Sequence, residues 1–169
     1  MAGRRRFIIK EGKIERFTEN LVNLLKIIIG LLFAIMASIM IINVITRYFF
    51  HTSLTFVGEL SQYLTIWVAL LGSVILVIKG EHITVDVLEN HLRSKSKKVI
   101  QICCILVSSL FFVVQIFYGI VFITMTTGQS ASSISFLPMN VVYAVFPVSG
   151  ILMLFGSFYK LYLLFSQER

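Results

Sequence analysis

The sequence predicts an all-α integral membrane protein of four long, tilted transmembrane helices. Its residues are 57% hydrophobic and only 14% charged, whereas soluble domains contain about 45–50% apolar and about 25% charged residues. Four segments contain the roughly 20 mostly apolar residues that a helix needs to cross a bilayer. Their apolar runs are continuous rather than alternating, which argues against a closed β-barrel.

The four helices are expected in a single transmembrane domain, 1–169, at about residues 21–50, 57–78, 99–125 and 138–165. Several exceed the length that the bilayer requires, so we expect them to tilt or to protrude. In the fourth, Pro147 removes a backbone hydrogen bond and should bend the helix. Gly72, Gly150 and Gly156 would allow close helix contacts.

The connection 79–98 carries the run KGEHITVDVLENH, which is rich in acidic and histidine residues. A helical interpretation places apolar residues on one side and charges on the other, as in an amphipathic segment at the membrane interface. His82 and Asp86 are one turn apart and could share a metal, but a convincing third ligand is missing. We therefore expect His82 to hold the connection through a hydrogen bond or a cap.

Basic residues predict the orientation of the chain. The N-terminal flank, the connection 79–98 and the C-terminal end hold almost all Lys and Arg residues, whereas the other two loops hold only Arg47. The positive-inside rule then places both termini and the connection in the cytoplasm. The net charge of +7 lies on these flanks, which fits a membrane surface and argues against a nucleic-acid partner.

Polar residues gather where the first helix ends and the second begins. Glu59, Gln62, Tyr63 and Ile66 share one face of the second helix by their spacing. Arg47 stands at the other end of the short connection, so it could pair with Glu59, or one of the two could bind a partner subunit. The alternative is that Arg47 reaches lipid phosphate and Glu59 faces water.

Neither a catalytic constellation nor a transport pathway is evident. The sequence has no triad, phosphate loop or metal-ligand cluster, and the first three predicted helices have nearly pure apolar centres. The chain is therefore not expected to be an enzyme, and alone it makes a poor transporter. Two alternatives stay open: a small four-helix redox enzyme, for which Cys103 and Cys104 lie near the wrong end, and a self-sufficient homodimeric transporter.

The stretch from Arg47 to Leu92 resembles the small membrane subunit of tripartite ATP-independent periplasmic (TRAP) transporters, the Q-type, four-helix component. The resemblance rests on the ordered combination of Arg47-Tyr48, Ser53, Glu59, Trp67, Leu71-Gly72, and Gly80 followed by His82, Ile83, Val85 and Asp86. Phe56 stands where the family often has Trp, and Gln62 where a basic residue is common.

The resemblance implies an accessory, scaffold subunit of a sodium-driven importer in a bacterial inner membrane. A large multi-span membrane subunit would carry the substrate and sodium sites, and a periplasmic binding protein would deliver an organic acid such as a dicarboxylate or a sialic acid. No cofactor is implied in this chain. The implied structural or partner-contact residues are Arg47, Glu59, Gln62, Trp67, Gly72, His82 and Asp86, while Lys95, Lys97 and Lys98 would contact lipid phosphates.

Overall fold

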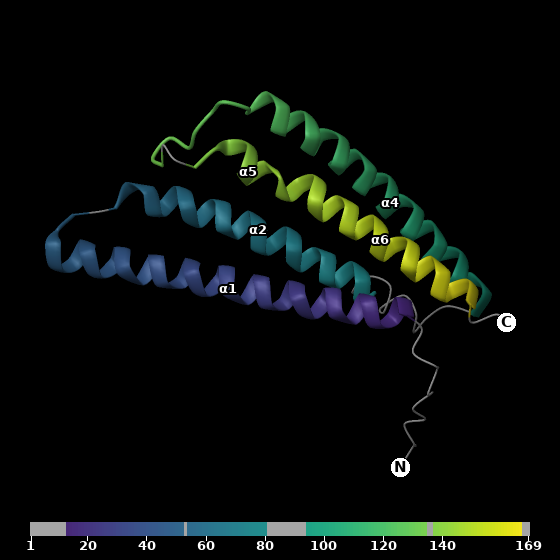
Figure 1. The fold of residues 1–169 in the computed structure, drawn as a ribbon. Coiled ribbons are helices and arrows are strands. Elements are labelled where there is room, and N and C mark those ends of the chain that lie inside the picture. The colour runs from purple at the N-terminus through teal and green to yellow at the C-terminus, as the bar shows by residue number, and fades with distance from the viewer. Residues whose placement is uncertain (1–12, 53, 81–93, 135–136, 167–169) are drawn as a thin grey trace, which may run out of the picture.

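The computed structural model describes residues 13–52, 54–80, 94–134 and 137–166. Five helices make up nearly all of this part of the chain (Figure 1): α1 (Lys13–Phe50), α2 (Thr55–Lys79), α4 (Ser94–Met125), α5 (Met139–Tyr143) and α6 (Val145–Ser166). Four spans, one of them formed by α5 and α6 together, are long and apolar enough to cross a membrane. The predicted all-α membrane fold with four spans is confirmed.

Two helices begin earlier than hydropathy predicts. α1 begins at Lys13 rather than near residue 21, and α4 begins at Ser94 rather than near residue 99. Both extensions are polar and rich in good helix formers, so helical propensity continues where hydropathy ends. The 38 residues of α1 reach roughly 57 Å at 1.5 Å per residue, well beyond a hydrocarbon core of about 30 Å.

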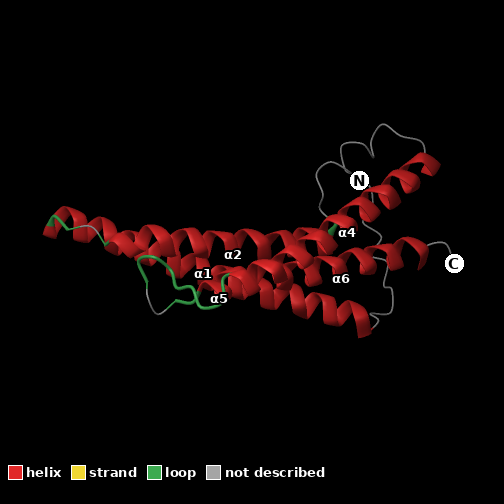
Figure 2. Cartoon of the chain, turned by 90° about the horizontal axis from the view of Figure 1, so that it is seen from above, coloured by secondary structure: helices red, strands yellow, loops and turns green. Residues whose placement is uncertain are grey.

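The spans form an open row instead of a closed bundle. α1 packs against α2, α2 against α6, and α6 against α4, and no packing of similar extent joins α1 to α4 among the described residues. Figure 1 shows this order, and in both Figures 1 and 2 the start of α1 and the end of α6 lie at the same end of the row. Consequently none of the most hydrophobic stretch of α1 is buried, whereas 44% of the corresponding stretch of the α5–α6 span is.

The core lies mainly between the two inner helices. Val74 of α2 with Val145 and Ser149 of α6 are fully buried. α1 adds Val22 and Leu25 to this core from its N-terminal half, and Phe17 meets the Phe155 ring edge-on with centroids 5.9 Å apart. The row is therefore best packed towards the end where the termini lie.

The fourth span is interrupted at Ala144, between α5 and α6. Pro147 lies three residues further on and has no N–H to donate to the carbonyl of Tyr143, which explains a break at this point. The sequence predicts a bend at Pro147, and the structure shows a break in the helix about one turn ahead of the proline.

Three glycines bring helices close together. A Cβ on Gly150 would lie 2.7 Å from Ile116 Cγ1, and one on Gly156 would lie 2.9 Å from Ile78 Cγ1, as predicted for these two positions. Gly119, which sequence reasoning missed, would place a Cβ 2.7 Å from Pro147 Cδ. The prediction for Gly72 was wrong within this chain, because nothing lies within 4 Å of that position.

α2 ends at Gly80, whose φ of 72° is left-handed and whose N–H bonds back to the carbonyls of Leu76 and Val77. Glycine adopts this conformation without the steric penalty of a side chain, so it closes the helix. The amphipathic segment expected after it, residues 81–93, lies outside the described residues.

Candidate functional site

Glu59 joins α2 to the loop 126–138 at the end of the row opposite the termini. Its Oε1 accepts hydrogen bonds from the Tyr63 hydroxyl at 2.6 Å and from the N–H of Ser132 at 3.0 Å. Its Oε2 accepts one from the N–H of Ser133 at 2.7 Å. A single carboxylate therefore fixes the tip of a loop that follows it by more than 70 residues in sequence.

The described parts of this loop, 126–134 and 137–138, are held by backbone hydrogen bonds. The N–H of Met139 bonds to the carbonyl of Gln129 at 3.0 Å, and that of Ala131 bonds to the carbonyl of Leu137 at 3.0 Å. Ala131 and Ile134 are only 4% and 5% exposed, although the composition of this segment predicts an exposed loop. The polar positions between these anchors, Ser132 and Ser133, remain on the surface.

Arg47 does not pair with Glu59, so that arm of the sequence hypothesis was wrong. The guanidinium carbon lies 5.6 Å from the centroid of the Tyr48 ring, and the carboxylate already accepts hydrogen bonds from Tyr63, Ser132 and Ser133. The two loop donors compete successfully with Arg47 for this carboxylate because both are backbone N–H groups held in place by the loop fold. Arg47 is exposed.

Asn43 connects α1 to the start of α2. Its Oδ1 accepts a hydrogen bond from the N–H of Leu54 at 3.1 Å, which holds the short connection between the helices against α1. His51 in this connection has a φ of 55°, a left-handed conformation that favours glycine and is uncommon for other residues. The Asn43 side chain thus anchors the start of α2 to α1.

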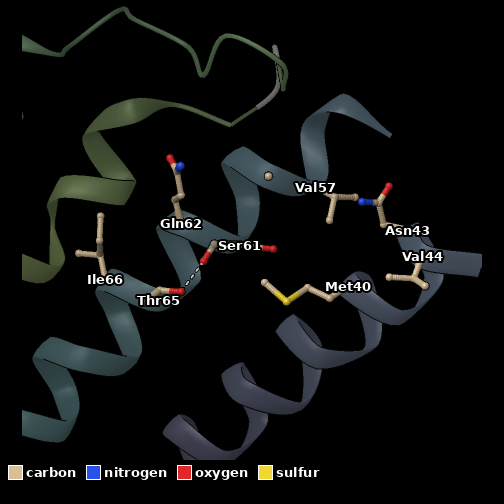
Figure 3. A pocket seen from close by; sticks show the side chains of 9 residues that line it. Met40, Asn43, Val44, Val57, Ser61, Gln62, Thr65 and Ile66 are labelled. Atoms are coloured by element: carbon tan, nitrogen blue, oxygen red, sulfur yellow. Dashed lines mark hydrogen bonds between the residues drawn. The ribbon is translucent and has the colours of Figure 1, made fainter. Parts of the chain in front are cut away.

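A groove of about 690 Å³ opens between α1 and α2 below this turn (Figure 3). We call it the α1–α2 groove; its lining residues are Met40, Asn43 and Val44 of α1 with Val57, Gly58, Ser61, Gln62, Thr65 and Ile66 of α2. The Ser61 side chain is 5% exposed, yet its Oγ has no hydrogen-bond partner. Thr65 donates to the carbonyl of Ser61 at 2.7 Å.

The remaining predicted residues fall in different places. Gln62 is exposed on the groove, Trp67 packs against the core, and Gly72 is partly buried. His82 and Asp86 lie outside the described residues. Lys95, Lys97 and Lys98 are in the first turns of α4, where the described structure includes the backbone but not these side chains. Among the members of this set that the structure describes, Gln62 alone lines the groove.

Sequence reasoning missed a polar contact inside the row. Gln115 Nε2 of α4 donates to Ser149 Oγ at 2.9 Å and lies 3.2 Å from the Phe146 carbonyl oxygen of α6. Ser149 also donates to the Phe146 carbonyl at 3.1 Å. The sequence does contain a signal for this contact, because a glutamine within an apolar span needs a hydrogen-bond partner. Which residue is that partner could not be predicted from the sequence.

Catalytic groups are not assembled in the part of the chain that the structure describes. No group of three or more His, Cys, Asp and Glu residues with metal-binding geometry occurs there, and Cys103 and Cys104 are exposed, free thiols. The polar groups instead tie helices and loops together. The fold and the site thus define a multi-pass α-helical membrane protein whose described polar contacts serve assembly.

Comparison with known proteins identifies the family. Residues 36–167 match the family described as tripartite ATP-independent periplasmic transporters, DctQ component. A Haemophilus influenzae protein named "Putative TRAP transporter small permease protein" is 33% identical over 82 residues, which cover 44% of this chain and 51% of that protein. The match thus spans about half the length of this relative.

The chain belongs to the DctQ family and is a small permease subunit of a TRAP transporter. Members of this family are transporter subunits and not enzymes, which removes the redox-enzyme alternative.

Proposed function

We propose that this chain is the accessory scaffold subunit of a sodium-coupled TRAP importer of organic acids in a bacterial inner membrane. In this proposal it packs against a large membrane subunit that carries the substrate and sodium sites. The observation that supports this assignment is the open row. Both outer helices, α1 and α4, expose long apolar faces that are available to lipid or to a second membrane subunit.

α4 has such an exposed apolar face on its outer side. Val107, Leu110 and Phe117 are each more than 60% exposed, and they recur at helical spacing along one side of a span. A helix that is apolar on its outer side can be buried against another membrane protein without loss of packing in its own chain. The row can therefore be attached to a larger subunit while its inner α2–α6 contact stays intact.

We further propose that the loop 126–138 helps to dock the periplasmic binding protein. The distribution of Lys and Arg supports cytoplasmic termini, and in that orientation the Glu59 end of the row would face the periplasm. Because Glu59 holds the backbone of Ser132 and Ser133, the loop would present a preformed surface. Preformed surfaces bind with a smaller loss of conformational entropy than flexible ones.

Reconstitution tests the assignment. The chain and a large subunit that co-purifies with it are placed in proteoliposomes with an imposed sodium gradient, the binding protein is added, and uptake of radiolabelled organic acids is measured. We expect uptake only when all three proteins are present. Sodium-driven flux through this chain alone would refute the accessory role and favour the homodimeric transporter.

The docking role has a separate test. In the same proteoliposomes, Glu59→Gln should raise the concentration of binding protein that gives half-maximal uptake, because the loop loses its anchor. Glu19→Gln, an exposed carboxylate near the other end of α1, should leave that concentration unchanged. An unchanged half-maximal concentration for Glu59→Gln would show that the fixed loop does not contribute to docking.

A further inference from the structure

We propose that the α1–α2 groove binds one phospholipid, with an acyl chain between the two helices and the phosphate at Arg47. The groove joins three features that match such a ligand: an apolar lining, a buried hydroxyl without a hydrogen-bond partner and a cation at its open end. The site requires neither transport nor a partner subunit, so it is independent of the proposed function.

The depth of the groove fits one leaflet of the bilayer. From Val57 to Ile66 it extends roughly 13 Å along α2 at 1.5 Å per residue, close to half of a hydrocarbon core of about 30 Å. Towards the termini it closes, because Leu25 of α1 and Leu71 of α2 join the core cluster. Its volume of about 690 Å³ lies within the roughly 300–1,000 Å³ of small-molecule sites.

The groove also contains a hydroxyl that a hydrocarbon chain alone would leave unsatisfied. Ser61 is 5% exposed, its buried Oγ has no hydrogen-bond partner, and the hydroxyl points into the space between the helices in Figure 3. Gln62 also lines the groove, but its amide points away from α1 in Figure 3. The ester carbonyls of a phospholipid lie just below its phosphate, and one of them would accept a hydrogen bond from the Ser61 hydroxyl.

Arg47 supplies the charge at the open end. It follows Val44 by three residues and Asn43 by four, which places it on the groove side of α1, one turn closer to the connection. The adjacent N-terminus of α2 has no side-chain cap, and its partial positive charge also favours an anion. Glu59, the nearby carboxylate, is turned towards the loop 126–138 and binds it.

A helix of a partner subunit fits the groove less well. Such a helix would need a channel along both leaflets, whereas this groove ends at Ile66 and is closed by the core beyond it. A single chain under a phosphate needs only one leaflet and a cation at the interface, which is what the groove offers.

Native mass spectrometry of the full-length chain in detergent tests the proposal, with dioleoyl phosphatidylglycerol and uncharged dioleoylglycerol as probes. Gly58→Leu fills the groove, because the space around Gly58 is open, and should weaken binding of both probes by about tenfold or more, as expected for the loss of two buried methylenes. Arg47→Gln should weaken phosphatidylglycerol by about fivefold and leave dioleoylglycerol unchanged.

Matched controls isolate the site. Gly30→Leu introduces the same side chain at another open glycine outside the groove, and Lys26→Gln removes another exposed cation of α1; both should bind like the wild type. If Gly58→Leu does not give wild-type helicity, Thr65→Phe fills the same groove from an exposed position.

Two results would overturn the proposal. The first is equal binding of the probes by the groove variants and their controls. The second is unchanged lipid binding by Gly58→Leu together with loss of co-purification of the large subunit, which would identify a protein helix as the occupant.

Discussion

Gly119→Ala should destabilise the contact between α4 and α6, and a matched glycine substitution measures by how much. A Cβ at Gly119 would lie 2.7 Å from Pro147 Cδ and 3.0 Å from both Phe146 Cβ and the Pro147 backbone nitrogen. None of these atoms belongs to the free end of a flexible side chain, so α4 and α6 must separate. Overpacking of this kind costs about 1–3 kcal/mol.

Gly72→Ala provides the reference. Both positions are helical and gain the roughly 0.8–1.0 kcal/mol that alanine offers over glycine in a helix, but nothing lies within 4 Å of a Cβ at Gly72. Helix propensity therefore cancels in the comparison. We expect Gly119→Ala to be less stable than Gly72→Ala by about 1–3 kcal/mol.

Unfolding in mixed micelles of increasing SDS content measures this difference. Trp67 is the single tryptophan and packs against the core, so its fluorescence reports loss of tertiary packing while far-UV circular dichroism reports helix content. Unfolding of the two variants at the same SDS fraction would contradict a close contact between α4 and Pro147.

Three further substitutions test the polar contacts. Glu59→Gln should accelerate amide exchange in the loop 126–138, since its carboxylate anchors two backbone N–H groups, whereas Glu19→Gln should not; equal exchange in both would contradict the anchor. Gln115→Leu should lower stability by about 0.6 kcal/mol and by no more than about 1.7 kcal/mol, which is the range for hydrogen bonds between membrane helices. A stabilising effect in SDS unfolding would argue against the bond between Gln115 and α6. Asn43→Ala should cost about 0.5–1.5 kcal/mol by releasing the connection to α2, with unchanged unfolding as the contradicting result.

Local sequence was sufficient for the helices and for the break in the fourth span. Hydropathy is averaged over the neighbouring residues that would cross the bilayer, and the missing N–H of Pro147 is a property of that residue alone. The helices and the break therefore both depend on local sequence. The start of α1 was placed too late because its first turns are helical without being apolar. Boundaries of this kind depend on propensity beyond the membrane, which a hydropathy window does not measure.

Only part of the candidate site could be predicted, because some of its contacts join residues that are far apart in the sequence. The Glu59–Tyr63 contact is one helical turn long, and the shared face of these two residues follows from spacing. The donors from Ser132 and Ser133 come from a loop more than 70 residues away, and they replace the expected Arg47. Which of several distant donors reaches a carboxylate depends on tertiary packing, and the pairing of Gln115 with α6 escaped prediction for the same reason.

The open row also has a mechanical consequence. In a closed bundle each helix packs against two neighbours, but among the described helices α1 has substantial contact with α2 alone. Near the connection even this contact is loosened by the α1–α2 groove, while the N-terminal half of α1 is held by Val22 and Leu25. α1 is therefore held mainly near its two ends, by this buried half and by the Asn43–Leu54 hydrogen bond, so a load on its outer face reaches the α2–α6 contact only through α2.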